Sequence, residues 1–145
     1  MTSSQQLPKS ERINSKKLID RLFKGGGAKS MSAFPLRVVF MTEDGDAHEP
    51  LAQMMVSVPK RFFKRAVKRN LVKRLVREAY RRNKQVLIDT LQTVEQRKTL
   101  SLCFIWTDNN LRSYEEVERK TANLLQRIAE KIGKDMAEEA ENVEQ

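Results

Sequence analysis

Apolar residues along this chain fall into short runs and into rows with helical spacing. Three runs rich in apolar residues, at 34–42, 52–58 and 100–106, predict β-strands. A turn signal at 43–46 follows the first of them, and the loop continues through Pro50. The second strand alternates most clearly, and its apolar face consists of Ala52, Met54, Val56 and Val58.

Two segments have the three- and four-residue spacing of amphipathic helices. The first is capped by Ser15 or Asn14 and stops at the three glycines 25–27. Its apolar stripe consists of Leu18, Ile19, Leu22 and Phe23. The second opens with the capping-box pattern at 113–116 and closes near Gly133. Its inward residues are Val117, Leu124, Leu125, Ile128 and Ile132.

A third helix is predicted from about Ala66 to about Thr90, and the segment around its start is strongly basic. Residues 60–82 hold 11 of the 28 Lys and Arg residues and one acid, Glu78. At helical spacing, one side carries a row of cations with Asn70 and Arg74 beside it. That row is Arg65, Arg69, Lys73, Arg77 and Arg81. The other side carries Leu71, Leu75 and Ala79, with Val72 and Val76 next to them.

This helix combines a core-facing side with a positive ridge. A merely solvated side would mix charges of both signs, because like charges four residues apart repel each other. Basic amphipathic helices also bind calmodulin or anionic membranes. Here the apolar side has only Val, Leu and Ala, which is typical of packing inside a domain. A phosphate backbone is the natural partner of the ridge. We expect Arg69 and Lys73 to be replaceable without loss of the fold.

Composition and charge divide the chain unevenly. Its 145 residues predict one domain, with 39% hydrophobic and 32% charged residues and a net charge of +9. Residues 135–145 contain five acids and no Lys or Arg, so 1–134 carry 28 cations against 14 acids. We expect 135–145 to be a disordered acidic tail, with a helical extension or an RNA mimic as alternatives. The polar residues 1–10 are also expected to be disordered.

Candidate catalytic and metal-ligating residues are sparse. The one histidine, His48, lies in a polar loop, and the one cysteine, Cys103, lies inside a predicted strand as a small buried residue. The acids are dispersed, zinc-ligand spacing is absent, and the glycines 25–27 lack the Lys-Ser/Thr of a phosphate-binding loop. We expect no signal peptide and no membrane span. The sequence predicts a cytoplasmic RNA-binding protein with no active site, membrane contact or small-molecule substrate of its own.

The order of residues in the basic segment is more specific than its charge. Residues 57–61 read Ser-Val-Pro-Lys-Arg, and 66–78 read AVKRNLVKRLVRE. This pattern closely resembles the signature of the bacterial ribonuclease P protein subunit, S-V-x-K-(K/R) followed by A-V-x-R-N-R-x-K-R-x-x-R-E. One departure is Leu71, which stands where the family has the second arginine of its Arg-Asn-Arg triplet.

The resemblance covers about residues 9–132 and implies an α+β fold. It is a small two-layer sandwich of order αβββαβα, similar to domain 2 of ribosomal protein S5, with a left-handed βαβ crossover through the basic helix. General chirality rules would predict a right-handed one. The first strand of that order is expected within 33–40 and the next two around the turn at 43–50. The RNA-binding domain is expected at 11–134.

The resemblance also implies a function. In that family the RNA subunit is the catalyst and holds most of the Mg²⁺. It removes the 5′ leader of precursor tRNA, and the protein assists by binding both ribonuclease P RNA and the leader. The implied docking residues are Lys60, Arg61, Lys64, Arg65, Lys68, Arg69, Asn70, Lys73, Arg74 and Arg77. The implied leader-cleft residues are Ile19, Phe23, Phe34 and Arg37.

Some alternatives remain open at the level of the sequence. Phe23 and Phe34 could belong to the core, and Phe62 and Phe63 could either stack on RNA or seal the helix onto the sheet. For the whole chain, the second interpretation is a non-enzymatic RNA-binding or ribosomal protein of similar fold. A third is a DNA-binding module, which requires a helix-turn-helix or a dimer interface.

Overall fold

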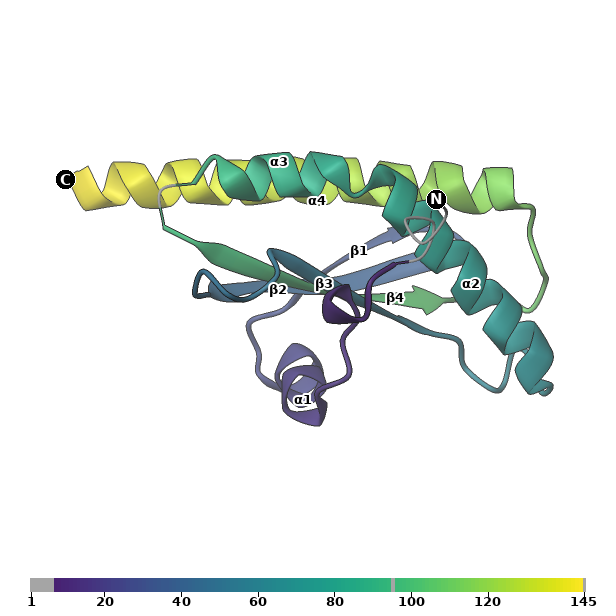
Figure 1. Ribbon diagram of the computed structural model, residues 1–145. Coiled ribbons are helices and arrows are strands. Elements are labelled where there is room, and N and C mark those ends of the chain that lie inside the picture. Colours follow the sequence, from purple (N-terminus) through teal and green to yellow (C-terminus); the bar gives the residue numbers. More distant parts are fainter. Residues whose placement is uncertain (1–6, 95, 145) are drawn as a thin grey trace.

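The computed structural model of the chain describes residues 7–94 and 96–144. It consists of one four-stranded sheet with helices on both faces (Figure 1). In chain order the elements are η2 (Lys9–Glu11), α1 (Lys16–Lys24), β1 (Lys29–Ala33), β2 (Leu36–Asp44), β3 (Ala52–Ser57), α2 (Ala66–Asn83), α3 (Gln85–Gln92), β4 (Lys98–Trp106) and α4 (Tyr114–Glu144).

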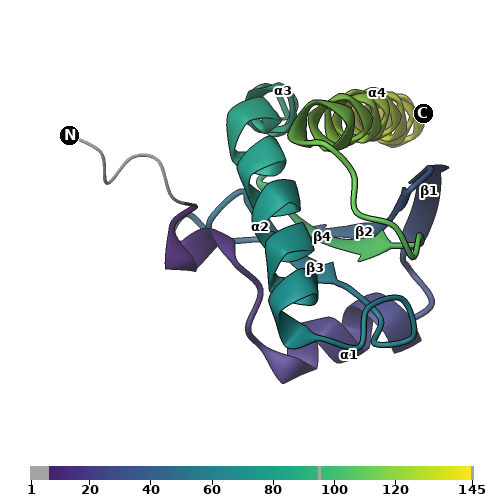
Figure 2. The same cartoon turned by 90° about the vertical axis from the view of Figure 1, so that its right-hand side faces the viewer.

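The sheet combines antiparallel and parallel pairing. Its strand order is β1-β2-β4-β3, and only the pair of β3 with β4 is parallel. A parallel pair needs a crossover, which α2 and α3 supply. In Figure 2 both β3 and β4 run toward the viewer, and β4 lies to the right of β3. Between them the chain rises from β3 into the helices above the sheet and then descends into β4. The crossover is therefore left-handed, as the resemblance implies.

The larger core lies between the sheet and the helices α2, α3 and α4. Trp106 and Phe104 of β4 and Tyr80 of α2 are completely buried there. The rings of Tyr80 and Phe104 meet edge to face, with centroids 6.2 Å apart. Burial of these large side chains fixes the rotation of α2 about its axis, which decides which of its residues face outward.

A smaller core lies on the opposite face, under α1. Leu22 of α1 packs against Val39, Met41 and Cys103 of the sheet. Figure 1 shows α1 below the strands and α3 and α4 above them, while α2 slopes from α3 down past one end of the sheet. The two-layer sandwich expected from the sequence thus has a third, partial layer.

The start and stop of α1 are as predicted. Its cap is Ser15, whose Oγ accepts a hydrogen bond from the Leu18 N–H at 3.3 Å. Beyond the helix, Gly26 has a φ of +79°, a conformation that favours glycine. The glycine run therefore ends the helix and turns the chain toward the sheet.

The first strand was placed wrongly by the sequence analysis. β1 ends at Ala33, where the expected range of 33–40 begins, and the apolar run at 34–42 forms most of β2 instead. β1 is an edge strand whose residues are mostly exposed, so its sequence, Lys-Ser-Met-Ser-Ala, lacks apolar alternation. The next two strands, β2 and β3, do flank the predicted turn region.

The basic helix also ends earlier than predicted. α2 stops at Asn83, whose side-chain amide donates to the Ala79 carbonyl at 2.8 Å. A new helix begins at once, because the Lys84 carbonyl accepts from the Leu87 N–H at 2.9 Å. Residues 66–92 are thus two helices with a bend at Lys84, where the sequence predicts one that ends near Thr90.

The last helix does not close near Gly133. The predicted cap is present, since Ser113 Oγ accepts from the Glu116 N–H at 3.2 Å, but α4 continues to Glu144. Asp135 supports the extra turns through ion pairs with Lys29 at 2.6 Å and Lys131 at 3.1 Å. The segment expected to be a disordered acidic tail is therefore helical as far as residue 144.

The N-terminal expectation is contradicted where the structure describes it. Residues 1–6 of the segment expected to be disordered lie outside the described residues. Leu7 is buried in the larger core, and η2 follows at Lys9–Glu11. The residues just before α1 therefore belong to the folded domain.

Candidate RNA interface

The ten docking residues implied by the sequence lie on one continuous stretch of chain, which we call the basic surface. Lys60, Arg61, Lys64 and Arg65 lie between β3 and α2, and the others follow in the first twelve residues of α2. All ten are exposed or half-exposed. None of the nine cations among them makes an ion pair with any acid among residues 7–94 and 96–142, so their charge is available to a polyanion.

The core-facing side of α2 is displaced from the predicted one. Val72, Val76, Ala79 and Tyr80 are buried, whereas Leu71 is 37% exposed. Leu71 was expected in the inward row, and that expectation was wrong. Together with Val67, which is 79% exposed, it forms a small apolar spot within the basic surface.

Arg69 has a role in the fold that the sequence analysis did not predict. Its Nη1 donates to the carbonyl oxygens of Phe63 and Lys64, each at 2.8 Å. These bonds hold the turn that leads into α2. The Phe63 ring is buried in the larger core, and Phe62 is half-buried with the Arg61 guanidinium 4.8 Å from its centroid. Phe63 therefore seals the helix onto the sheet.

Replacement of Arg69 by alanine is expected to destabilise the fold by about 1–2 kcal/mol, because two charge-assisted hydrogen bonds to the carbonyl oxygens of the preceding turn are lost. Lys68→Ala is the control, since Lys68 is exposed and makes no side-chain bond among the described residues. Denaturant unfolding of both variants measures the difference. Equal stability of Arg69→Ala and wild type would show that these hydrogen bonds contribute nothing.

The row of unpaired cations on α2 ends at Glu78. Glu78 pairs with Arg81 at 2.6 Å and with Arg82 at 3.0 Å, and both arginines hold the pKa of that carboxyl below its usual value. Arg81, which the helical spacing places in the row of cations, is therefore partly neutralised. The unneutralised part of α2 runs from Lys68 to Arg77.

Of the four leader-cleft residues, the structure brings two together. Phe23 of α1 and Arg37 of β2 border an open hollow of about 240 Å³ between α1 and the sheet. The hollow is also lined by Leu22, Gly26, Ala28, Lys29, Ser30 and Val39. Phe23 is 48% exposed, so its ring does not belong to the core. Ile19 is half-buried on α1 and does not line the hollow.

Phe34 lies apart from this hollow. It occupies the tip of the β1–β2 hairpin, is 57% exposed, and has the Arg112 guanidinium 5.1 Å from its ring centroid. Arg112 is held in turn by Asp108 at 2.8 Å and Glu116 at 2.5 Å. Phe34 is thus exposed, and outside the core, on a different part of the surface from Phe23.

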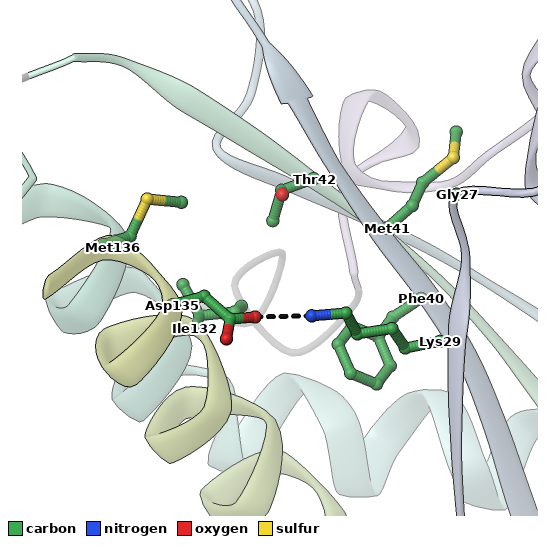
Figure 3. A pocket seen from close by; sticks show the side chains of 8 residues that line it. All are labelled: Gly27, Lys29, Phe40, Met41, Thr42, Ile132, Asp135 and Met136. Atoms are coloured by element: carbon green, nitrogen blue, oxygen red, sulfur yellow. Dashed lines mark hydrogen bonds and ion pairs between the residues drawn. The ribbon is translucent and has the colours of Figure 1, made fainter. Parts of the chain in front are cut away.

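A second, smaller hollow lies between α4 and the first two strands. Figure 3 shows the Lys29 ammonium reaching across to Asp135, with Met136 and Ile132 on the helix side. Its volume is about 60 Å³, room for little more than a water molecule or two. The ion pair therefore closes a structural joint between β1 and α4 and offers no space for a nucleotide.

The other candidate groups have structural explanations. Cys103 is completely buried, and burial raises the pKa of its thiol to about 12, so it stays protonated. His48 is exposed in the loop after β2, where its backbone N–H donates to Asp46 Oδ1 at 2.8 Å. Within the described part of the chain, no three His, Cys, Asp or Glu side chains are placed to hold a metal, and no helix there is long and apolar enough to span a membrane.

Comparison with known protein families identifies the family of this chain. The Ribonuclease P family matches residues 7–129, which include the basic surface, α1, the whole sheet and about the first half of α4. The chain belongs to the ribonuclease P protein family. It is a protein subunit of an endoribonuclease of tRNA processing, and ribonuclease P has an RNA partner and is generally magnesium-dependent.

Individual ribonuclease P proteins agree with this assignment. A ribonuclease P protein component of Porphyromonas gingivalis is 44% identical over 124 residues, covering 85% of this chain and 86% of its own. The solved ribonuclease P protein of Thermotoga maritima is 25% identical, with a TM-score of 0.61 over 81% of this chain and 96% of its own. That of Staphylococcus aureus, at 16% identity and a TM-score of 0.54 over 81% of this chain and 94% of its own, shows likeness of fold alone.

Leu71→Arg, which restores the ribonuclease P family triplet, is expected to tighten binding to ribonuclease P RNA by roughly three- to tenfold. The new side chain adds about one phosphate contact, so the slope of log K against log salt steepens by roughly one. Stability is expected to change little because Leu71 lies at the surface. Val67→Arg is the matched control, one turn earlier. Equal gains for both variants would mean that any added charge suffices.

Two basic residues of this ribonuclease P protein escaped the sequence analysis. Lys29 lines the hollow beside Phe23 and Arg37, and Arg12 lies next to α2. Lys29 stands in the unrecognised strand β1, and Arg12 in a segment whose pairing partner is more than forty residues away. A local pattern carries no signal for either position.

Proposed function

We propose that the basic surface docks on ribonuclease P RNA and that the hollow under α1 holds the 5′ leader of precursor tRNA. The observation that supports docking most strongly is the unpaired charge of the basic surface, set on a helix whose opposite side is buried. A rigid row of unneutralised cations fits crowded phosphates and is otherwise self-repelling.

Docking by this surface assists catalysis by the RNA through electrostatics. The cations lower the repulsion between catalytic RNA and substrate, so the two approach and RNA-bound Mg²⁺ is favoured. Asn70 is exposed and supplies a neutral donor and acceptor beside the charges. In this account Mg²⁺ is held mainly by the RNA subunit, and the protein contributes no catalytic group.

The hollow under α1 provides the features that an unpaired leader requires. Phe23 offers a ring face for base stacking, and Arg37 offers charge for the backbone. We assign Phe34, at the tip of the β1–β2 hairpin, to the path of the leader RNA outside the hollow. Ile19 is half-buried on α1, and we assign it a role in packing this helix and not in contacting the leader.

The partners of the protein are therefore two RNAs, ribonuclease P RNA and precursor tRNA, in the cytoplasm. Neither a membrane nor a small-molecule substrate has a role in this account. A ribosomal role is not favoured, because the family match is to ribonuclease P.

The salt dependence of binding tests the docking proposal. Affinity for ribonuclease P RNA is measured over a range of NaCl concentrations at fixed Mg²⁺. A slope of log K against log salt of roughly −4 or steeper is expected, because each neutralised phosphate contributes roughly −0.7 to −0.9. A nearly flat response would overturn docking through the basic surface.

A further inference from the structure

The helix α1 rests on the sheet through one row of apolar side chains. Of its nine residues, all of which the structure describes, Leu22 alone is buried, and Leu18 packs beside it with partial exposure. Their partners in the sheet include Val39 and Met41 of β2. Apolar contact is not directional, so a single row does not prevent α1 from rolling about its own axis. A further contact is needed to fix the rotation of this helix.

A bidentate ion pair supplies that contact. The Arg21 guanidinium donates to the Glu43 carboxylate from Nε at 2.9 Å and from Nη2 at 3.2 Å. Two hydrogen bonds between planar groups fix the orientation of both side chains. Arg21 belongs to α1, and Glu43 lies near the end of β2, 22 residues later in the chain. The pair therefore links the helix directly to the strand that it covers.

The ion pair lies on the side of α1 that faces away from the hollow. Successive residues of an α-helix are about 100° apart, so Arg21 and Phe23 project to opposite flanks when Leu22 faces the sheet. On β2, Arg37 lines the hollow, and Glu43 lies on the same face six residues farther on, about 20 Å along the strand. One flank of α1 is thus held to the sheet, and the hollow opens under the other flank.

We propose that Arg21 and Glu43 are positioning residues for the 5′ leader. By fixing the rotation of α1, the pair keeps the Phe23 ring at the border of the hollow. Among the residues that the structure places around the hollow, neither Arg21 nor Glu43 is present, so the pair acts through Phe23. The role toward the leader rests on the proposed function, whereas the fixed orientation of α1 does not.

Direct contact of Arg21 with the leader backbone is the competing explanation, and it makes the opposite prediction. The Arg21 side chain is 52% exposed and carries a charge that could neutralise a phosphate. If Arg21 bound the RNA, removal of its carboxylate partner would release the cation and strengthen binding of precursor tRNA. If Arg21 positions α1, the same change weakens binding of precursor tRNA.

Glu43→Gln in the assembled enzyme separates the two explanations. The ratio of precursor to mature tRNA affinity is expected to fall by roughly three- to tenfold, because the Phe23 ring is displaced and its stacking on a base is partly lost. Asp20→Asn is the matched control. It also removes one acid, but the ion pair of Asp20 with Lys24, at 4.0 Å, stays within α1, so the ratio is expected to be unchanged. An unchanged or raised ratio in Glu43→Gln would overturn the proposal.

Exchange of the two charges provides a second test. Arg21→Glu alone is expected to lower the ratio at least as much as Glu43→Gln, because two carboxylates then face each other. The double variant Arg21→Glu, Glu43→Arg is expected to regain most of the wild-type ratio, because the link is rebuilt in the reverse sense. A double variant no better than Arg21→Glu would assign Arg21 to direct contact with the RNA and overturn the proposal.

Hydrogen exchange of the protein without RNA keeps this inference separate from the proposed function. In Glu43→Gln, the amides of α1 are expected to exchange faster than in the wild type by on the order of threefold, with the amides of α2 unchanged. Equal exchange in both proteins would show that the pair does not hold α1. A wild type that binds precursor and mature tRNA equally would instead overturn the proposed role of the hollow, and exchange in α1 would still decide the role of the pair.

Discussion

Glutamine at three cations of the basic surface is expected to weaken binding to ribonuclease P RNA by on the order of ten- to a hundredfold near 0.15 M salt. The three are Lys64, Arg65 and Lys68, which are exposed and unpaired in the described structure. Each removed phosphate contact lowers the steepness of the salt dependence, so the slope is expected to become shallower by roughly two to three. Filter binding or fluorescence titration across salt concentrations measures both quantities.

A matched triple variant separates the position of the charges from their number. Arg119, Lys120 and Lys134 also comprise one arginine and two lysines, lie on α4, and make no ion pair among the described residues. Their replacement by glutamine is expected to weaken binding only a few-fold. Neither triple is expected to lower stability by more than about 1 kcal/mol, since surface changes are usually small. Equal losses of affinity would show that only net charge matters.

Phe23→Ala is expected to weaken binding of precursor tRNA to the assembled enzyme by roughly ten- to a hundredfold, because stacking contributes roughly 1–3 kcal/mol per base. Binding of mature tRNA, which lacks the leader, is expected to be unchanged. The ratio of the two affinities is the measurement, so a general loss of folding or docking cancels. Phe23 is 48% exposed, and the stability cost is expected to be small.

The control for the leader prediction is Leu111→Ala, which removes another exposed apolar side chain in the loop before α4. It is expected to leave the ratio of precursor to mature tRNA affinity unchanged. A Phe23→Ala variant that weakens both tRNAs equally would mean that this ring does not contact the leader. Arg37→Gln is expected to lower the ratio as well, by a smaller factor, because one charged contact is lost.

The sequence predicted the parts of the fold that depend on local patterns. The glycine stop after α1, the cap of α4 and the strands β2, β3 and β4 all carry periodicity or turn chemistry within a few residues. β1 was missed because an exposed edge strand needs no apolar face. The end of α4 was misplaced because a glycine stop signal is overridden by the contact of Asp135 with Lys29, residues far apart in the chain.

The site residues also divide into those that depend on local spacing and those that depend on tertiary packing. A row of cations on one helix can be read from spacing, and the ribonuclease P signature named its members. The bonds from Arg69 to the preceding turn and the outward rotation of Leu71 depend on how α2 seats against the sheet. The position of Arg12 depends on a bridge to Met54 of β3, which no local pattern encodes.

Cleavage of precursor tRNA at low Mg²⁺ by a bacterial ribonuclease P RNA, with and without this protein, tests the central claim most directly. We expect the protein to stimulate cleavage at the mature 5′ end, and we expect no cleavage by the protein alone. Cleavage by the protein alone would reveal an active site in the chain. Tight binding to the cognate RNA without any stimulation would contradict the assignment as an assisting subunit.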